Sequence, residues 1–149
     1  MKKVLAQNKK ALFDYEVLDE FETGIKLEGR EVKPLKAGNV NIKGAFVVIQ
    51  EEELFLKGAT ISRYKYDGSG DYDPKRLRKL LLKKKEIERI MTKLNTQGVT
   101  LIPIEFYLKK NLIKLRIALG KGRKKHDKRQ LIKKRDQKRE IEKAIKSHR

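Results

Sequence analysis

Apolar and polar residues alternate along several short stretches of the chain, which is the pattern of half-buried β-strands. In the first stretch, residues 13–17, Phe13, Tyr15 and Val17 alternate with acids. Further strands are predicted at residues 24–32, 45–49, 54–56 and 61–66, punctuated by Gly38, Gly44, Glu51, Glu52 and Gly58. Many short strands at fairly even spacing predict a mainly β domain, either a barrel or a sandwich.

The clearest hairpin lies late in the chain. An apolar stretch at 99–107 is followed by the polar residues 109–111, and then apolar residues recur at every second position from Ile113 to Leu119. Residues two apart in a strand share one face, so this second strand has a continuous apolar face. Pro103 cannot donate a ladder hydrogen bond, which predicts an edge strand or a bulge.

Between these strand groups the pattern changes. Residues 66–73 are rich in Gly and Asp and predict a mobile loop. Asp73 and Pro74 resemble the start of a helix, and residues 84–94 have apolar side chains at helical spacing. Periodicity alone does not decide whether residues 78–82 join that helix or are extended.

The charge of the chain is strongly positive and unevenly distributed. The 149 residues have a formal net charge of +19, and residues 120–149 have fourteen Lys or Arg against four Asp or Glu. We therefore predict one RNA-binding domain at 1–119 and a basic C-terminal tail at 120–149. Both parts carry surplus positive charge, which favours a nucleic-acid partner.

The tail has few apolar residues with which to fold by burial. As a helix it would place more like-charged than oppositely charged pairs four residues apart, which opposes the helix by about 1–2 kcal/mol. The sequence thus predicts a tail that is disordered when free and becomes helical when phosphates neutralise it.

Residues for catalysis are scarce. The chain has two histidines, no cysteine and no P-loop, HExxH or GxGxxG motif, so we predict that it is not an enzyme and has no metal site or cofactor. It also lacks an apolar run long enough for a membrane span or a leader peptide. These absences predict a soluble cytoplasmic protein.

Two groups of residues indicate binding. His126 lies among cations, where its ring could stack on an exposed base, although the tail could also act as a simple polycation. The run Leu80-Leu81-Leu82 cannot point inward throughout, so at least one leucine is exposed beside Arg76, Arg78 and Lys79. Glu22 on its own would be read as a solvated turn residue.

Five separated motifs give the chain a resemblance to a known family. They are Asn8-Lys9-Lys10-Ala11, Phe21-Glu22-Thr23-Gly24-Ile25, the run from Leu27 to Lys36, the run from Arg76 to Leu82, and His126-Asp127-Lys128-Arg129. In this order they resemble the SsrA-binding protein family from about Asn8 to Arg149. The resemblance implies a closed antiparallel β-barrel of the OB type with short flanking helices.

The resemblance also implies partners and a function. It implies a monomer that binds the tRNA-like domain of transfer-messenger RNA and delivers it to stalled 70S ribosomes lacking a codon in the A site. Elongation factor Tu would take part through the charged RNA. The tail would become helical in the empty mRNA channel beside the decoding centre, which allows ribosome rescue and tagging of the nascent peptide.

Individual roles follow by position. Contacts with the tRNA-like domain are implied for Asn8, Lys9, Glu22, Lys33, Arg76, Arg78, Lys79, Leu81 and Lys83. Contacts with the decoding centre and mRNA channel are implied for Lys124, Lys125, His126, Asp127, Lys128 and Arg129. Lys83 departs from the family's usual Asn or His, so a phosphate contact could replace base recognition there. A structural ribosomal protein, which would also be small, basic and tailed, is the alternative function.

Overall fold

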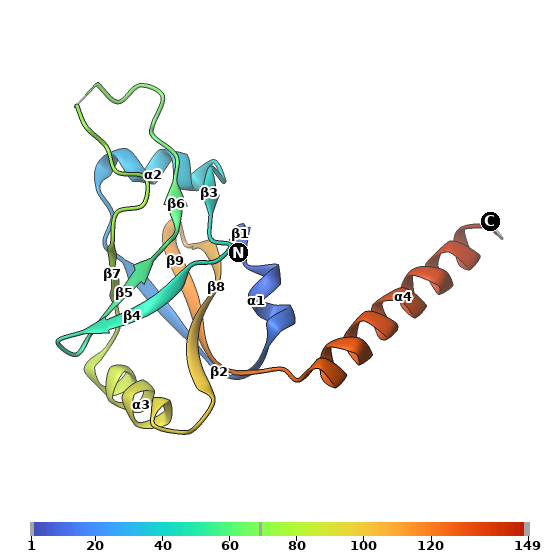
Figure 1. The fold of residues 1–149 in the computed structure, drawn as a ribbon. Helices are drawn as coiled ribbons and strands as arrows, with labels where there is room; N and C mark the ends of the chain where they lie inside the picture. Colours follow the sequence, from blue (N-terminus) through green and yellow to red (C-terminus); the bar gives the residue numbers. More distant parts are fainter. Residues whose placement is uncertain (1, 69, 148–149) are drawn as a thin grey trace.

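A computed structural model describes residues 2–68 and 70–147 of the chain, with side chains up to Lys143 (Figure 1). His148 lies outside the described residues. The strands are β1 (Lys2–Gln7), β2 (Tyr15–Ile25), β3 (Val40–Asn41), β4 (Phe46–Gln50), β5 (Glu53–Lys57), β6 (Thr60–Ile61), β7 (Arg78–Leu81), β8 (Val99–Lys109) and β9 (Leu112–Gly122). The helices are α1 (Lys9–Asp14), α2 (Gly29–Lys36), α3 (Lys84–Leu94) and α4 (Lys125–Ser147).

The strands form one antiparallel sheet and a short ribbon. The sheet has seven strands in the order β1-β8-β9-β2-β7-β5-β4, and β3 pairs with β6. A mainly β fold with flanking helices is therefore confirmed. The sheet does not close into a barrel, however, because β1 and β4 remain its two edges among the described residues. The closure of the barrel implied by the resemblance is therefore wrong for this structure, and the OB type is not confirmed by it.

The local structure of β8 explains the open sheet. β4 contacts β8 without forming a ladder, while β1 pairs only with the second half of β8, from Glu105 to Lys109. Pro103 has no N–H to offer at this edge, and the register shifts between Pro103 and Glu105. Helix α1 then packs on Ile102 and Ile104. The predicted bulge at Pro103 is confirmed, and it lies where a closed barrel would need a regular ladder.

The late hairpin is confirmed. Lys110 and Asn111 both have positive φ, of 50° and 65°, as required of a two-residue turn that matches the twist of the flanking strands. Leu115, Ile117 and Leu119 are all at most 1% exposed, so the apolar face predicted for this strand lies in the main core. The hairpin therefore supplies a large part of the surface on which the domain packs.

Helix α3 spans the predicted residues, Lys84–Leu94, and buries Ile90 completely. Ile87 and Leu94 pack against the main core from the same face of the helix. Residues 78–82 do not join this helix, because Arg78–Leu81 is the extended strand β7.

Several elements differ from the sequence prediction. Phe13 belongs to helix α1, because Asn8 caps that helix by accepting a hydrogen bond from the Ala11 N–H at 3.3 Å. The strand predicted at 24–32 is divided between the end of β2 and helix α2. No helix begins at Asp73 in the described structure; its carboxylate instead accepts from the Lys75 N–H in a turn.

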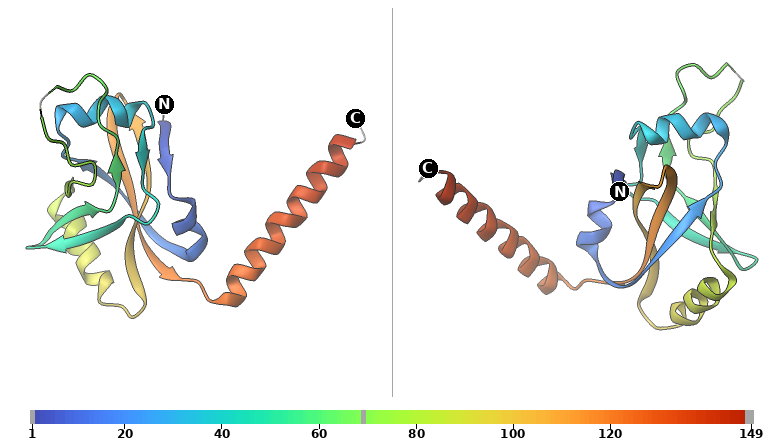
Figure 2. Two further views of the ribbon diagram at one scale, coloured as in Figure 1. Left: turned by 45° about the horizontal axis from the view of Figure 1, so that its top comes forward. Right: turned by 180° about the vertical axis from the view of Figure 1, so that it is seen from behind.

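The tail is an α-helix that projects away from the sheet in every view (Figures 1 and 2). The expectation of a disordered free tail therefore differs from the structure. Residues 125–147 contain no Gly or Pro and consist largely of good helix formers. The helix is also supported by oppositely charged pairs three residues apart, such as Lys133 with Asp136 and Arg139 with Glu142. The free energy of about 1–2 kcal/mol predicted to oppose the helix counted only pairs four residues apart and therefore omitted these.

Candidate RNA interface

The exposed leucine of the triplet lies on the outer face of the sheet where β2 meets β7. Leu80 is buried, whereas Leu81 is 50% exposed, so the prediction that the three leucines do not all point inward is confirmed. Leu81 pairs with Gly24, and a Cβ on Gly24 would lie 3.2 Å from the Cβ of Leu81. The absence of a side chain at Gly24 therefore lets Leu81 lie over β2. We call Glu22, Gly24 and Leu81 the β2–β7 face.

Glu22 lies in strand β2 rather than in a turn, and it shares the outer face with Gly24 because the side chains between and before them point into the core. Its carboxylate Oε2 accepts hydrogen bonds from the Tyr107 hydroxyl at 2.5 Å and from Lys109 Nζ at 3.4 Å. The hydrogen bond from Tyr107 holds the pKa of Glu22 below its ordinary value, and Lys109 adds to the effect. Glu22 is thus an ionised acceptor for N–H or hydroxyl donors.

Tyr107 is the support of Glu22 that the sequence did not reveal. It is 1% exposed although it lies on the outer face, because charged side chains cover it. Lys2 Nζ and the Arg116 guanidinium lie 4.9 and 5.3 Å from its ring centroid, and both form ion pairs with Glu105. Burial raises the pKa of the Tyr107 hydroxyl, so Tyr107 remains a hydrogen-bond donor. The sequence did hold a signal for this support: residues 105, 107 and 109 are polar or aromatic and lie at every second position of β8, which places them on one face.

Arg78 is not on the surface. It is 0% exposed, and its Nε donates to Glu31 Oε2 at 2.7 Å while Nη1 donates to the Ala59 carbonyl at 3.0 Å. Glu31, also fully buried, forms a second ion pair with Arg76 at 2.5 Å. Of the cationic rim predicted from Arg76, Arg78 and Lys79, Arg78 is therefore turned inward, where it joins α2 to β7, while the Arg76 side chain stays 31% exposed. In this structure Arg78 is enclosed within the protein on β7, the strand that carries Leu81.

Asn8 is also buried. Its side-chain N–H donates to the Pro103 carbonyl at 3.0 Å and its Oδ1 caps α1, so both ends of the amide are used within the protein. Lys9 is exposed on the same helix, which packs on β8 and not on the β2–β7 face. These two residues thus lie on a different element from Leu81.

The remaining predicted lysines are accessible. Lys79 is partly exposed and its Nζ lies 3.0 Å from a Glu53 carboxylate oxygen. Lys83 is exposed at the N-terminus of α3, directly after the triplet. Lys33 is exposed on α2, where its Nζ lies 5.4 Å from the Tyr64 ring centroid. Lys79 and Lys83 therefore flank the β2–β7 face, and Lys33 does not belong to it.

The predicted tail residues lie around the start of α4. Lys124, Lys125, His126, Asp127 and Arg129 are exposed. The Lys124 N–H donates to the Asp127 carboxylate at 3.4 Å, next to the N-terminus of the helix, where a negative charge is favourable.

Lys128 differs from its neighbours because it contacts α1. Its Nζ lies 3.1 Å from a carboxylate oxygen of Asp14 and 5.8 Å from the ring centroid of Phe13. The Arg123 N–H donates to the backbone carbonyl of Asp14 at 2.8 Å. A shallow groove between the two helices is lined in part by Leu12 and Leu131. The base of the tail is therefore held against α1.

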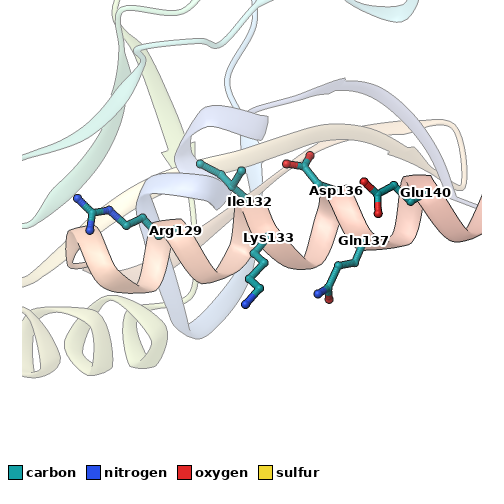
Figure 3. Close-up of a pocket in the computed structure, with 6 residues that line it drawn as sticks. All are labelled: Arg129, Ile132, Lys133, Asp136, Gln137 and Glu140. Atoms are coloured by element: carbon teal, nitrogen blue, oxygen red, sulfur yellow. The ribbon is translucent and has the colours of Figure 1, made fainter.

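In α4 beyond Lys128, no ion pair or side-chain hydrogen bond to the body is found among the side chains that the structure describes, up to Lys143. Figure 3 shows Ile132, Asp136 and Glu140 on one side of the helix and Lys133 and Gln137 on the other. These side chains border a concavity that is formed by a single exposed helix. We therefore regard it as surface relief and not as a separate binding site.

Two absences apply to the described residues. Within residues 2–68 and 70–147, no group of three or more His, Cys, Asp or Glu side chains could hold a metal ion. In the same part of the chain, no helix has the length and apolar character that a membrane crossing requires.

Comparison with known proteins decides the family. The family model described as SmpB protein matches residues 5–147. The chain belongs to the SmpB family. An SsrA-binding protein of Carboxydothermus hydrogenoformans is 44% identical over 147 residues, covering 99% of both chains. One of Bacillus subtilis strain 168 is 44% identical over 143 residues, covering 96% of this chain and 92% of the relative.

A solved structure supports the same relationship. It is described as "tmRNA-SmpB: a journey to the center of the bacterial ribosome", and one of its chains matches with a TM-score of 0.66 and 38% identity. The match covers 80% of this chain and 85% of the other. The resemblance drawn from the five sequence motifs is thus confirmed at the level of the SmpB family.

Proposed function

We propose that this chain is a non-enzymatic RNA-binding adaptor of trans-translation. It binds the tRNA-like domain of transfer-messenger RNA and delivers it to ribosomes stalled without a codon in the A site. The observation that carries the proposal is the SmpB family match over residues 5–147. The net charge of +19 supports a polyanionic partner. Elongation factor Tu would join through the charged RNA, with the adaptor acting as a monomer in the cytoplasm.

The β2–β7 face is the proposed surface for the tRNA-like domain. The exposed Leu81 offers an apolar contact for a base or sugar, while the ionised Glu22 accepts hydrogen bonds from base N–H or ribose hydroxyl groups. Lys79 and Lys83 lie on either side to pair with phosphates. An acceptor, an apolar contact and flanking cations together distinguish a folded RNA from a plain polyanion.

The tail is proposed to act on the ribosome and not on the tRNA-like domain. Its helix projects from the body (Figure 1). His126 lies in the first turn of this helix and is exposed. In the mRNA channel the cations would face ribosomal phosphates and His126 would stack on a base of the decoding centre. Lys128 can join them only when it leaves Asp14, so entry into the channel would exchange an internal ion pair for an RNA contact.

Two substitutions in the full-length chain test this division of roles. Leu81→Ala should weaken binding to a tRNA-like RNA about tenfold, because it removes roughly 1–2 kcal/mol of apolar contact. His126→Ala should leave that affinity within about twofold and abolish peptide tagging in a translation reaction stalled on a message without a stop codon. The measurements are RNA binding over a salt series and the yield of tagged peptide.

An unrelated hairpin RNA of equal length is the control. If the chain binds it as tightly as the tRNA-like RNA, the adaptor function is wrong and general polyanion binding replaces it. If His126→Ala lowers RNA affinity as much as Leu81→Ala, the separation of the two surfaces is wrong.

A further inference from the structure

The segment between β6 and β7 presents aromatic rings and basic groups in alternation, as Arg63-Tyr64-Lys65-Tyr66. Tyr66 is 75% exposed, and its ring meets that of Tyr64 edge-on with the centroids 5.5 Å apart. Lys65 Nζ lies 5.5 Å from the Tyr66 centroid, and Lys33 of α2 lies 5.4 Å from that of Tyr64. Exposed rings flanked by ammonium groups are typical of surfaces that stack unpaired bases and hold the adjoining phosphates.

The turn that carries Tyr66 is fixed by ion pairs and by a backbone hydrogen bond. The side chain of Asp67 is only 7% exposed, and its carboxylate forms ion pairs with Arg30 at 3.4 Å and Arg63 at 3.8 Å. The Asp67 N–H donates to the Tyr64 carbonyl at 3.0 Å, which closes the turn around Tyr66. The protein thus anchors the turn while leaving the ring outside, so stacking on Tyr66 requires little further ordering of the chain.

Two of the nearby charges remain available to a ligand. In the part of the chain that the structure describes, neither Lys33 nor Lys65 lies within ion-pair distance of a carboxylate, whereas Arg30 and Arg63 engage Asp67. This segment and α4 project from opposite sides of the body in all three views (Figures 1 and 2). The cluster is therefore separate from the tail, and it shares no residue with the β2–β7 face.

We propose that Tyr66, together with Tyr64, Lys33 and Lys65, forms a second RNA-binding site that stacks one unpaired base and holds its phosphate. The inference rests on the proposed function only in taking RNA as the partner. Tyr66 supplies the exposed ring, Tyr64 fixes its orientation, and the two lysines supply the positive charge.

A fluorescent reporter tests the stacking directly. The chain contains no tryptophan, so Tyr66→Trp in the full-length protein introduces a single indole at an exposed position. We expect a tRNA-like RNA with unpaired loop bases to quench its fluorescence, and a fully paired RNA duplex of equal length to leave it unchanged. Phe46→Trp is the matched control, because Phe46 is also exposed, at 46%, with Lys57 Nζ 5.9 Å from its ring centroid.

Affinity measurements complete the test. Tyr66→Ala should weaken binding of the tRNA-like RNA about five- to hundredfold, while Tyr66→Phe should retain most of the affinity because the ring still stacks. Lys65→Ala should lower the dependence of binding on salt by about one phosphate contact. Absence of quenching, equal quenching by the duplex, or unchanged affinity of Tyr66→Ala would each overturn the second site.

The proposed function is judged by a different result. Leu81→Ala is measured in the same titrations. If Leu81→Ala loses affinity and Tyr66→Ala does not, the second site is wrong and the adaptor function stands. If the unsubstituted chain does not distinguish the tRNA-like RNA from the duplex, the adaptor function itself is wrong.

Discussion

Replacement of Arg78 by Ala should destabilise the protein far more than it affects any surface. Arg78 is fully buried, and its guanidinium donates to Glu31, to the Ala59 carbonyl and to the Pro74 carbonyl at 2.7, 3.0 and 3.0 Å. Its loss leaves the buried Glu31 with fewer donors and the Ala59 carbonyl without the Arg78 donor, whereas the Pro74 carbonyl still accepts from the Ile61 N–H at 3.0 Å. Removal of one partner of a buried ion pair costs about 3–5 kcal/mol, a large part of the stability of a typical domain.

Urea denaturation followed by far-UV circular dichroism measures this cost. With a dependence on urea of about 2 kcal/mol per molar, the unfolding midpoint should fall by about 2 M. Lys79→Ala is the matched control on the same strand, and its half-exposed ion pair with Glu53 should contribute no more than about 1 kcal/mol. Arg78→Lys keeps the charge but loses the forked geometry, so its midpoint should lie between those of Arg78→Ala and the unsubstituted chain.

The result that refutes this reasoning is a folded Arg78→Ala protein with an unchanged midpoint and weaker RNA binding. Arg78 would then contact a phosphate of the RNA, as its place in the motif suggested. Its buried ion pair with Glu31 would not contribute to the stability of the protein in solution.

Two further predictions concern α2 and the β2–β7 face. Burial raises the pKa of Glu31, but hydrogen bonds from the Glu28 N–H, Arg76 and Arg78 outweigh it and leave that pKa lowered. The ionised carboxylate therefore stabilises the fold above its unfolded pKa, and this contribution is lost as the pH falls through the lower folded pKa. Glu31→Gln should make acid unfolding less steep, and an identical slope would contradict the assignment. Gly24→Ala should weaken binding of the tRNA-like RNA at nearly unchanged tagging per bound RNA, because the new Cβ would push Leu81 outward; unchanged affinity in a binding titration would show that the close approach is not needed.

Local sequence pattern was sufficient for the elements whose residues pack by simple periodicity. The apolar residues at every second position of β9 and the helical spacing in α3 each gave the correct element, since both repeats follow directly from strand and helix geometry. The exposed Leu81 also followed from the triplet, because a strand turns alternate side chains to opposite faces. The positive charge of the tail and the five family motifs were likewise present in the sequence alone.

Tertiary structure decided the features that depend on partners distant in the sequence. Asn8 lies between β1 and α1, and its side-chain N–H donates to the Pro103 carbonyl. The sequence pattern near residue 13 does not reveal this distant hydrogen bond, so it did not predict helix α1. From the sequence alone Arg78 is read as a surface cation, but in the structure it is paired with Glu31 of α2. Glu22 is likewise read as a solvated acid, but in the structure it accepts a hydrogen bond from the Tyr107 hydroxyl. The periodicity of a sequence indicates which positions of a helix or strand face the core. Whether a charged side chain can be buried depends instead on an opposite charge from a segment distant in the sequence, because an unpaired buried charge is unfavourable.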